Sequence, residues 1–195
     1  MIVSGGRSMA LHNTEQEWGS LAKGLHWIVA ILLIGLVPSG IYMDRLDTSI
    51  PAEREIFLQL VFWHKSCGML VLLLMLVRLC WRWMSSTVPA LPEESKTWER
   101  HMAHSIHGLL YIIVIAQVLS GWLMSSAGGH PVTLFGWFEF PPLVDKNKEI
   151  GEAGRAAHAI MGKPLLILIF VLHVVGALKH HYVNKNNVLK RMMPW

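Results

Sequence analysis

One segment decides the fold of this chain: HAIMGKPLLILIFVLHVVGALKHH, residues His158–His181. It is long and apolar enough to cross a bilayer, yet it contains His158 at its start and His173 fifteen residues later. Lipid offers an imidazole no polar partner, so an ionisable residue inside a span indicates a functional site. Fifteen residues of helix cover about 22 Å and return to within about 60° of the same face. One helix therefore presents two histidines to one side at two depths.

The remainder of the chain is equally suited to lipid. Of its 195 residues, 53% are hydrophobic and only 15% are charged, against about a quarter charged in soluble domains. Windows of about 19 residues predict four spans, and each must be helical to satisfy its own backbone. We therefore expect an all-α membrane protein, a single domain over residues 1–195 in which four transmembrane helices form a bundle: Leu25–Met43, Ile56–Trp83, His104–Ser125 and Ala156–Lys179.

Lysine and arginine predict the orientation of the spans. The leader, the second loop and the tail carry ten of these residues: Arg7, Lys23, Arg78, Arg82, Lys96, Arg100, Lys179, Lys185, Lys190 and Arg191. The other two loops carry five: Arg45, Arg54, Lys146, Lys148 and Arg155. Because basic flanks stay on the inner side of the membrane, we expect both termini in the cytoplasm. These flanks also explain the formal charge of +4, and we expect no nucleic-acid partner.

This orientation sorts the histidines by depth. His26 lies near the cytoplasmic start of the first span, and His64 lies in the outer part of the second. In the fourth span His158 is outer and His173 is inner. We therefore pair His26 with His173 and His64 with His158. Each pair can supply the two axial ligands of a haem iron in the core of the bundle.

Two small residues and one basic residue match these depths. Gly40 follows His26 by fourteen residues on nearly the same face, and Gly68 follows His64 by one turn. Both can leave room for a bound ring, although small residues also serve helix packing. Arg78 follows His64 by fourteen residues, which turns it inward at the inner depth. Its guanidinium can bind a haem propionate.

Three more histidines begin the third span: His101, His104 and His107. At the inner end of the bundle, His104 or His107 can compete with His26 as the partner of His173. They can also line a quinone pocket or donate hydrogen bonds to a propionate. We expect roles other than metal ligation for all three.

The chain resembles the bacterial cytochromes b561, small four-helix membrane proteins that carry two haems, over about Leu25–Met193. The resemblance rests on LHW (Leu25–Trp27), HKSCG (His64–Gly68), HGLLY (His107–Tyr111) and LHVVGALKHHY (Leu172–Tyr182). It implies two non-covalent b haems and a multi-pass location in the bacterial inner membrane. It also implies one ligand from each of the first two spans and two from the fourth, which correspond here to His26, His64, His158 and His173.

One spacing departs from the family pattern. The interval between His158 and His173 is one residue longer than usual, and Pro164 lies inside it. We predict a local π-type widening of the helix at Pro164 that absorbs the extra residue and realigns the two faces.

The resemblance also implies a function. Members of the family transfer single electrons between a periplasmic donor and ubiquinone, and some are superoxide oxidases. Superoxide is therefore the leading candidate donor here, which would make the chain a superoxide:quinone oxidoreductase, although another small molecule or a protein can take this place. Two alternatives stay open: a cytochrome b subunit that anchors a dehydrogenase in the membrane, and a haem-binding structural bundle without turnover.

An anionic donor would be attracted by outer cations. Lys65 directly follows His64 and borders the outer site, and Lys163 and Arg155 lie near His158. We take these three residues as candidates for guiding the substrate, together with Arg54 of the first loop. Lys65 and Lys163 can equally extend to the membrane interface, where their partners would be lipid and water.

Overall fold

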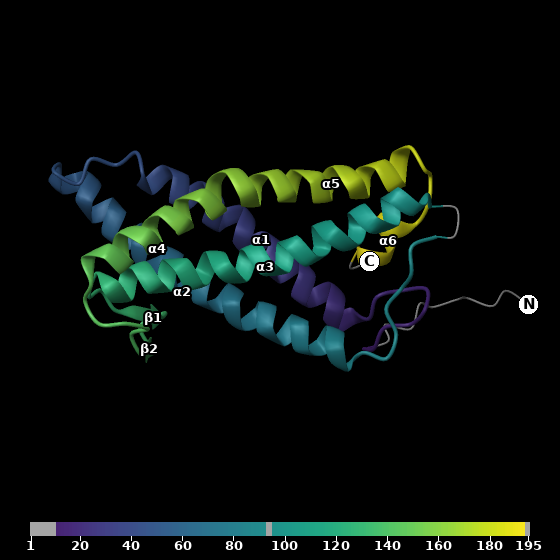
Figure 1. Ribbon diagram of the computed structural model, residues 1–195, viewed down its shortest axis with the longest axis horizontal. Coiled ribbons are helices and arrows are strands. Elements are labelled where there is room, and N and C mark those ends of the chain that lie inside the picture. The colour runs from purple at the N-terminus through teal and green to yellow at the C-terminus, as the bar shows by residue number, and fades with distance from the viewer. Residues whose placement is uncertain (1–10, 93–94, 194–195) are drawn as a thin grey trace, which may run out of the picture.

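The computed structural model describes residues 11–92 and 95–193; Arg7, one of the basic residues counted above, lies outside them. Four long apolar helical segments run side by side (Figure 1). The first three are α1 (Ser20–Met43), α2 (Pro51–Met84) and α3 (Thr97–Ala127). The fourth segment spans Lys148–Tyr182 and consists of α4 (Lys148–Ile160), the π-helix η1 (Met161–Leu165) and α5 (Leu166–Tyr182). The four predicted spans and the all-α membrane architecture are confirmed.

Each helix extends beyond the predicted span because polar residues form its first turn. Pro51 occupies the first turn of α2, where its missing N–H is not needed. At the start of α3, Glu99 Oε2 accepts from the backbone N–H of Lys96 at 2.9 Å. Asn147 Oδ1 caps α4 by accepting from the backbone N–H of Ile150 at 3.1 Å. A hydropathy window detects only the apolar part of such a helix.

The bundle has two distinct ends. At one end, between α3 and α4, strands β1 (Val132–Leu134) and β2 (Phe138–Phe140) form an antiparallel hairpin. Ser66 of α2 fixes this hairpin by donating to the carbonyl of Thr133 at 2.9 Å and accepting from the N–H of Phe135 at 3.1 Å. At the opposite end lies the short helix α6 (Val188–Met192). We call the two ends the hairpin end and the tail end.

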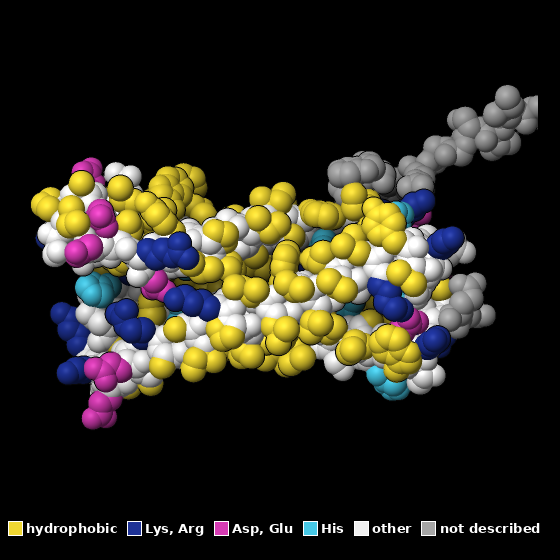
Figure 2. All heavy atoms as spheres, turned by 90° about the horizontal axis from the view of Figure 1, so that it is seen from above, with side chains coloured by type: hydrophobic (Ala, Val, Ile, Leu, Met, Phe, Trp, Pro, Cys, Tyr) yellow, Lys and Arg dark blue, Asp and Glu magenta, His cyan; other side chains and the backbone are white. Residues whose placement is uncertain are grey.

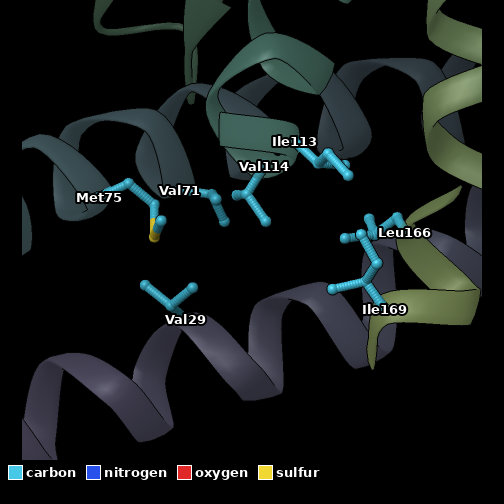
Figure 3. Packing of buried hydrophobic residues seen from close by; sticks show 7 residues of the cluster. All are labelled: Val29, Val71, Met75, Ile113, Val114, Leu166 and Ile169. Atoms are coloured by element: carbon cyan, nitrogen blue, oxygen red, sulfur yellow. The ribbon is translucent and has the colours of Figure 1, made fainter. Parts of the chain in front are cut away.

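Apolar side chains fill the middle of the bundle and also cover its outside. The largest buried cluster joins α1, α2, α3 and α5 (Figure 3): Val29, Val71, Met75, Ile113, Val114, Leu166 and Ile169. On the outside, hydrophobic side chains form a belt while charged side chains gather at both ends (Figure 2). Ile31, Ile112 and Leu168 are each more than half exposed. A helical bundle with an apolar exterior is suited to lipid rather than to water.

The fourth segment contains the predicted π-type widening. The backbone N–H of Leu166 bonds to the carbonyl of Met161, five residues earlier, and Pro164 lies inside this turn. Proline lacks an N–H and disturbs a regular α-helical turn, so a wider turn is a natural place for it. The prediction made from the extra residue between His158 and His173 is confirmed.

Candidate functional site

Four histidines meet in two pairs inside the bundle. His64 of α2 and His158 of α4 have ring centres 6.2 Å apart, with their planes inclined by 72°. His26 of α1 and His173 of α5 have ring centres 6.1 Å apart, with their planes inclined by 62°. The first pair lies toward the hairpin end and the second toward the tail end. The pairing predicted from depth is therefore the pairing found; the role of these residues as metal ligands stays a prediction.

The separation of the rings suits a shared metal ion. A metal–imidazole bond measures about 2 Å and a ring nitrogen lies about 1 Å from the ring centre, so imidazoles on opposite sides of one ion have centres about 6 Å apart. Two imidazoles in direct hydrogen-bonded contact would lie closer. The ring-centre separations of both pairs match this value.

A cavity of about 250 Å³ opens beside the hairpin-end pair. His64, His158, Gly40 and Gly68 all line it, and most of its other lining side chains are apolar. A Cβ atom added to Gly40 would lie 3.4 Å from Cε1 of His64, whereas one added to Gly68 would meet no atom within 4 Å. Both glycines therefore lie beside the cavity, where a side chain would take space from a bound planar group.

Gly121 of α3 lies even closer to the hairpin-end pair. A Cβ atom added there would lie 2.9 Å from Cε1 of His158, which is too close without a shift of the ring. Gly121 also lines the cavity. Glycine at this position lets α3 pass close to the imidazole without displacing the ring.

Hydrogen bonds hold both rings of the hairpin-end pair. The Nδ1 atom of His64 lies 3.0 Å from Oγ of Ser39 in α1. The Nδ1 atom of His158 lies 2.8 Å from the carbonyl oxygen of Gln117 and 3.2 Å from Oγ of Ser120, both in α3. Each ring is thus fixed through Nδ1 by a neighbouring helix.

The tail-end pair has different surroundings. His107 of α3 has its ring centre 5.2 Å from that of His173, closer than His26. The Nδ1 atom of His26 is buried and has no hydrogen-bond partner in the described part of the chain. Arg78 lies close enough to interact electrostatically with all three of these histidines, and its guanidinium lies 5.6 Å from the ring centre of Tyr111. Arg78 thus lies near the tail-end pair, and its role toward a propionate stays a prediction.

Three of the cations expected to guide an anion, Lys65, Lys163 and Arg155, line the cavity of the hairpin end, whereas Arg54 is not among its lining residues. Lys163 forms an ion pair with Asp44, and Lys65 donates to the carbonyl of Pro131 at 3.2 Å, which ties α2 to the hairpin. Arg155 is exposed, and the structure gives it no hydrogen bond or ion pair among residues 11–92 and 95–193. Two of the three charges are therefore engaged by the protein itself, and Arg155 has the most accessible one.

Sequence reasoning missed the residues that hold the rings. The candidate site residues predicted from the sequence did not include Ser39, Gln117, Ser120, Gly121 or Asp44. A signal was present in α3, because residues three and four apart share a helix face and Gln117, Ser120 and Gly121 follow this spacing inside an apolar span. Ser39 offered no comparable pattern, since a single serine in a span is common in helix packing.

Known proteins resemble this chain along nearly its whole length. A family model described as prokaryotic cytochrome b561 matches residues 17–195. Cytochrome b561 homolog 2 of Escherichia coli (strain K12) is 33% identical over 189 residues, which cover 95% of both chains. Probable superoxide oxidase CybB of Yersinia pestis is 29% identical over 180 residues, 92% of this chain and 97% of its own. Cytochrome b562 of Cereibacter sphaeroides is 28% identical over 179 residues, 92% of this chain and 96% of its own.

Proposed function

The chain belongs to the prokaryotic cytochrome b561 family, and from this premise we propose that it holds two b haems, one at each histidine pair, and carries single electrons from a donor at the hairpin end to ubiquinone. Membership makes the protein a bacterial multi-pass membrane cytochrome that binds b-type haem and transfers electrons. The number of haems, their ligands, the donor and the acceptor belong to the proposal, as does the location in the inner membrane.

One observation carries the proposal: two imidazole pairs with ring centres 6.2 Å and 6.1 Å apart lie at opposite ends of one bundle. The residues present fit the group. The hairpin-end pair borders a cavity of about 250 Å³ lined by glycines, and the tail-end pair has nearly the same ring-centre separation with Arg78 close by. When bound, haem supplies reversible one-electron chemistry at its iron.

Each residue has a role of its own in this proposal. His64 and His158 bind one iron, while His26 and His173 bind the other. Gly40 and Gly68 leave room for the ring at the hairpin end, and Arg78 offers a planar pair of donors to a propionate at the tail end. The apolar core between the pairs keeps water away from the electron path. Because His158 and His173 belong to one continuous segment, that segment forms a wall of both sites.

Superoxide is the donor that we propose. Two superoxide anions each give up one electron and become O₂, and the two electrons with two protons convert one ubiquinone to ubiquinol. Support comes from a 29% identical relative that is named a probable superoxide oxidase and from the exposed Arg155 beside the cavity. A cation at this place raises the local concentration of a small anion. The basic residues of the loops favour the periplasmic side for the hairpin end.

The haem content of the purified protein tests the first part. A reduced-minus-oxidised spectrum with quantitative haem extraction should give two b haems per chain. No reversible b-type band would reject electron transfer and leave a structural bundle. One haem per chain would reject the assignment of two sites.

Stopped-flow mixing with superoxide tests the donor. We expect haem reduction well above the uncatalysed background, followed by reoxidation on addition of ubiquinone. Arg155→Ala should slow the reduction several-fold and weaken its dependence on ionic strength, whereas Lys190→Ala, at an exposed cation of the tail end, serves as the control. Reduction no faster than the background would remove superoxide as the donor. Turnover without any partner protein would reject the anchoring-subunit alternative.

A further inference from the structure

The direction of one hydrogen bond fixes the proton of His64. The hydroxyl of Ser39 donates to the carbonyl of Leu36 at 2.8 Å, and a hydroxyl has only one proton to donate. Both contacts of Ser39 Oγ are hydrogen bonds only when it donates to Leu36 and accepts from Nδ1 of His64 at 3.0 Å, and this is the arrangement that we adopt. The proton of the neutral ring lies on Nδ1, and the lone pair lies on Nε2.

The same reasoning applies to His158. The carbonyl of Gln117, 2.8 Å from Nδ1, can only accept. The hydroxyl of Ser120 also donates to that carbonyl at 2.8 Å, so its oxygen accepts from Nδ1 at 3.2 Å. His158 is thus held in the same tautomer as His64, with the lone pair again on Nε2.

From these contacts we propose that Ser39, and Ser120 together with the backbone carbonyl of Gln117, are positioning residues that fix the ligand tautomer and lower the reduction potential of the hairpin-end haem relative to the tail-end haem. This inference rests on the proposed function. An acceptor at Nδ1–H makes the imidazole a stronger donor at Nε2, which stabilises ferric over ferrous iron. Electrons entering at the hairpin end then move downhill toward the tail end.

At the tail end, the surroundings should raise the reduction potential of the haem instead of lowering it. Among the described residues, Nδ1 of His26 has no acceptor. Arg78 places a positive charge near His26 and His173, and a nearby cation favours the added electron of the ferrous state. The weaker ligand and the cation both raise the potential at this end.

The two positioning serines should differ in importance. Ser39 is the one acceptor that the structure gives Nδ1 of His64 within the described residues. His158 keeps the carbonyl of Gln117 at 2.8 Å if Ser120 is removed. Loss of Ser39 should therefore change the hydrogen bonding of the His64 ring more than loss of Ser120 changes that of the His158 ring.

The test is a redox titration of the purified holoprotein followed by optical spectroscopy, with electron paramagnetic resonance of the ferric state. Ser39→Ala should raise the reduction potential of the hairpin-end haem, which is identified as the one that His64→Ala removes. The equilibrium constant for its reduction should increase by up to about tenfold, which equals about 59 mV for a one-electron step. The other haem should keep its potential. Ser39→Thr, which retains a hydroxyl, should restore the wild-type value, and Ser120→Ala should give a smaller positive shift.

Ser105→Ala, at an exposed serine of α3, is the matched control and should move neither potential. If Ser39→Ala loads haem poorly, Ser39→Cys offers a weaker acceptor and should give a smaller positive shift. An unchanged hairpin-end potential in a Ser39 variant that still holds two haems would overturn the inference and leave the proposed function standing. A wild-type protein without two b haems would instead overturn the proposed function.

Discussion

The two histidine pairs have nearly the same ring separation but differ in what surrounds the rings. At the hairpin end, neighbouring helices accept hydrogen bonds from both imidazoles, and Gly121 lets α3 pass directly against one of them. At the tail end, His26 has an unpartnered ring nitrogen in the described part of the chain, and a third histidine and an arginine lie nearby. Equal spacing of the rings is therefore compatible with an iron at both sites, and the different surroundings are the basis on which we propose different reduction potentials for them.

The largest effect should come from removing one ring of a pair. His64→Ala should remove the hairpin-end haem and leave the tail-end haem, whereas His26→Ala should do the reverse, because each proposed site would lose one of its two imidazoles. Haem extraction and the reduced spectrum measure this directly. If both variants removed the same spectral component, the pairing would be wrong.

Crowding one ring should have a smaller but still large effect. In Gly121→Ala the new methyl group would press on the ring of His158, so the haem content should fall from two per chain toward one. Gly108→Ala is the matched control in the same helix, because a Cβ atom there meets nothing within 4 Å. A Gly121→Ala protein with two unperturbed haems would show that the close approach at the hairpin end is unimportant.

Removing the charge of Arg78 near the tail-end pair should shift the reduction potential of the tail-end haem without causing loss of that haem. Arg78→Gln should lower the reduction potential of the tail-end haem. The equilibrium constant for its reduction should fall about fivefold to tenfold, which corresponds to roughly 1 to 1.4 kcal/mol of Coulomb energy at an effective dielectric constant of about 20. Redox titration measures the shift, with Arg54→Gln, an exposed residue of the same helix, as the control. A shift confined to the hairpin-end haem would place Arg78 at the wrong site.

The smallest effect is expected from His107→Ala. Although this ring lies 5.2 Å from that of His173, we expect both haems to remain bound, because His26 completes the tail-end pair at 6.1 Å. A modest change in the tail-end potential should be the main result of the titration. Loss of the tail-end haem would make His107 the ligand and remove His26 from that role.

Much of this arrangement could be predicted from the sequence because lipid imposes strong constraints. The spans follow from apolar length, and the pairs follow from placing His26, His64, His158 and His173 at matching depths. The wide turn at Pro164 followed from a single extra residue. These features depend on periodicity along one helix at a time.

The positioning contacts could not be predicted because they depend on how helices pack. Whether Oγ of Ser39 reaches His64 is decided by the rotation of α1 against α2, which residue spacing does not determine. Lys163 was expected to guide an anion, but its pairing with Asp44 across two segments became visible only in three dimensions. The unpartnered nitrogen of His26 is likewise a property of its neighbours and not of its own helix.

The π-turn of η1 also gives the fourth segment a tolerance for changes in length. Its extra residue is confined to Met161–Leu165. The helix on either side therefore keeps its register, and the ring centres of the two histidine pairs lie 6.1 Å and 6.2 Å apart. An insertion here during evolution would have been absorbed where it arose, without repacking either end. Deleting one residue from this turn would return the segment to a regular α-helix. The π-turn is therefore the natural point for gaining or losing a residue between two sites that must stay aligned.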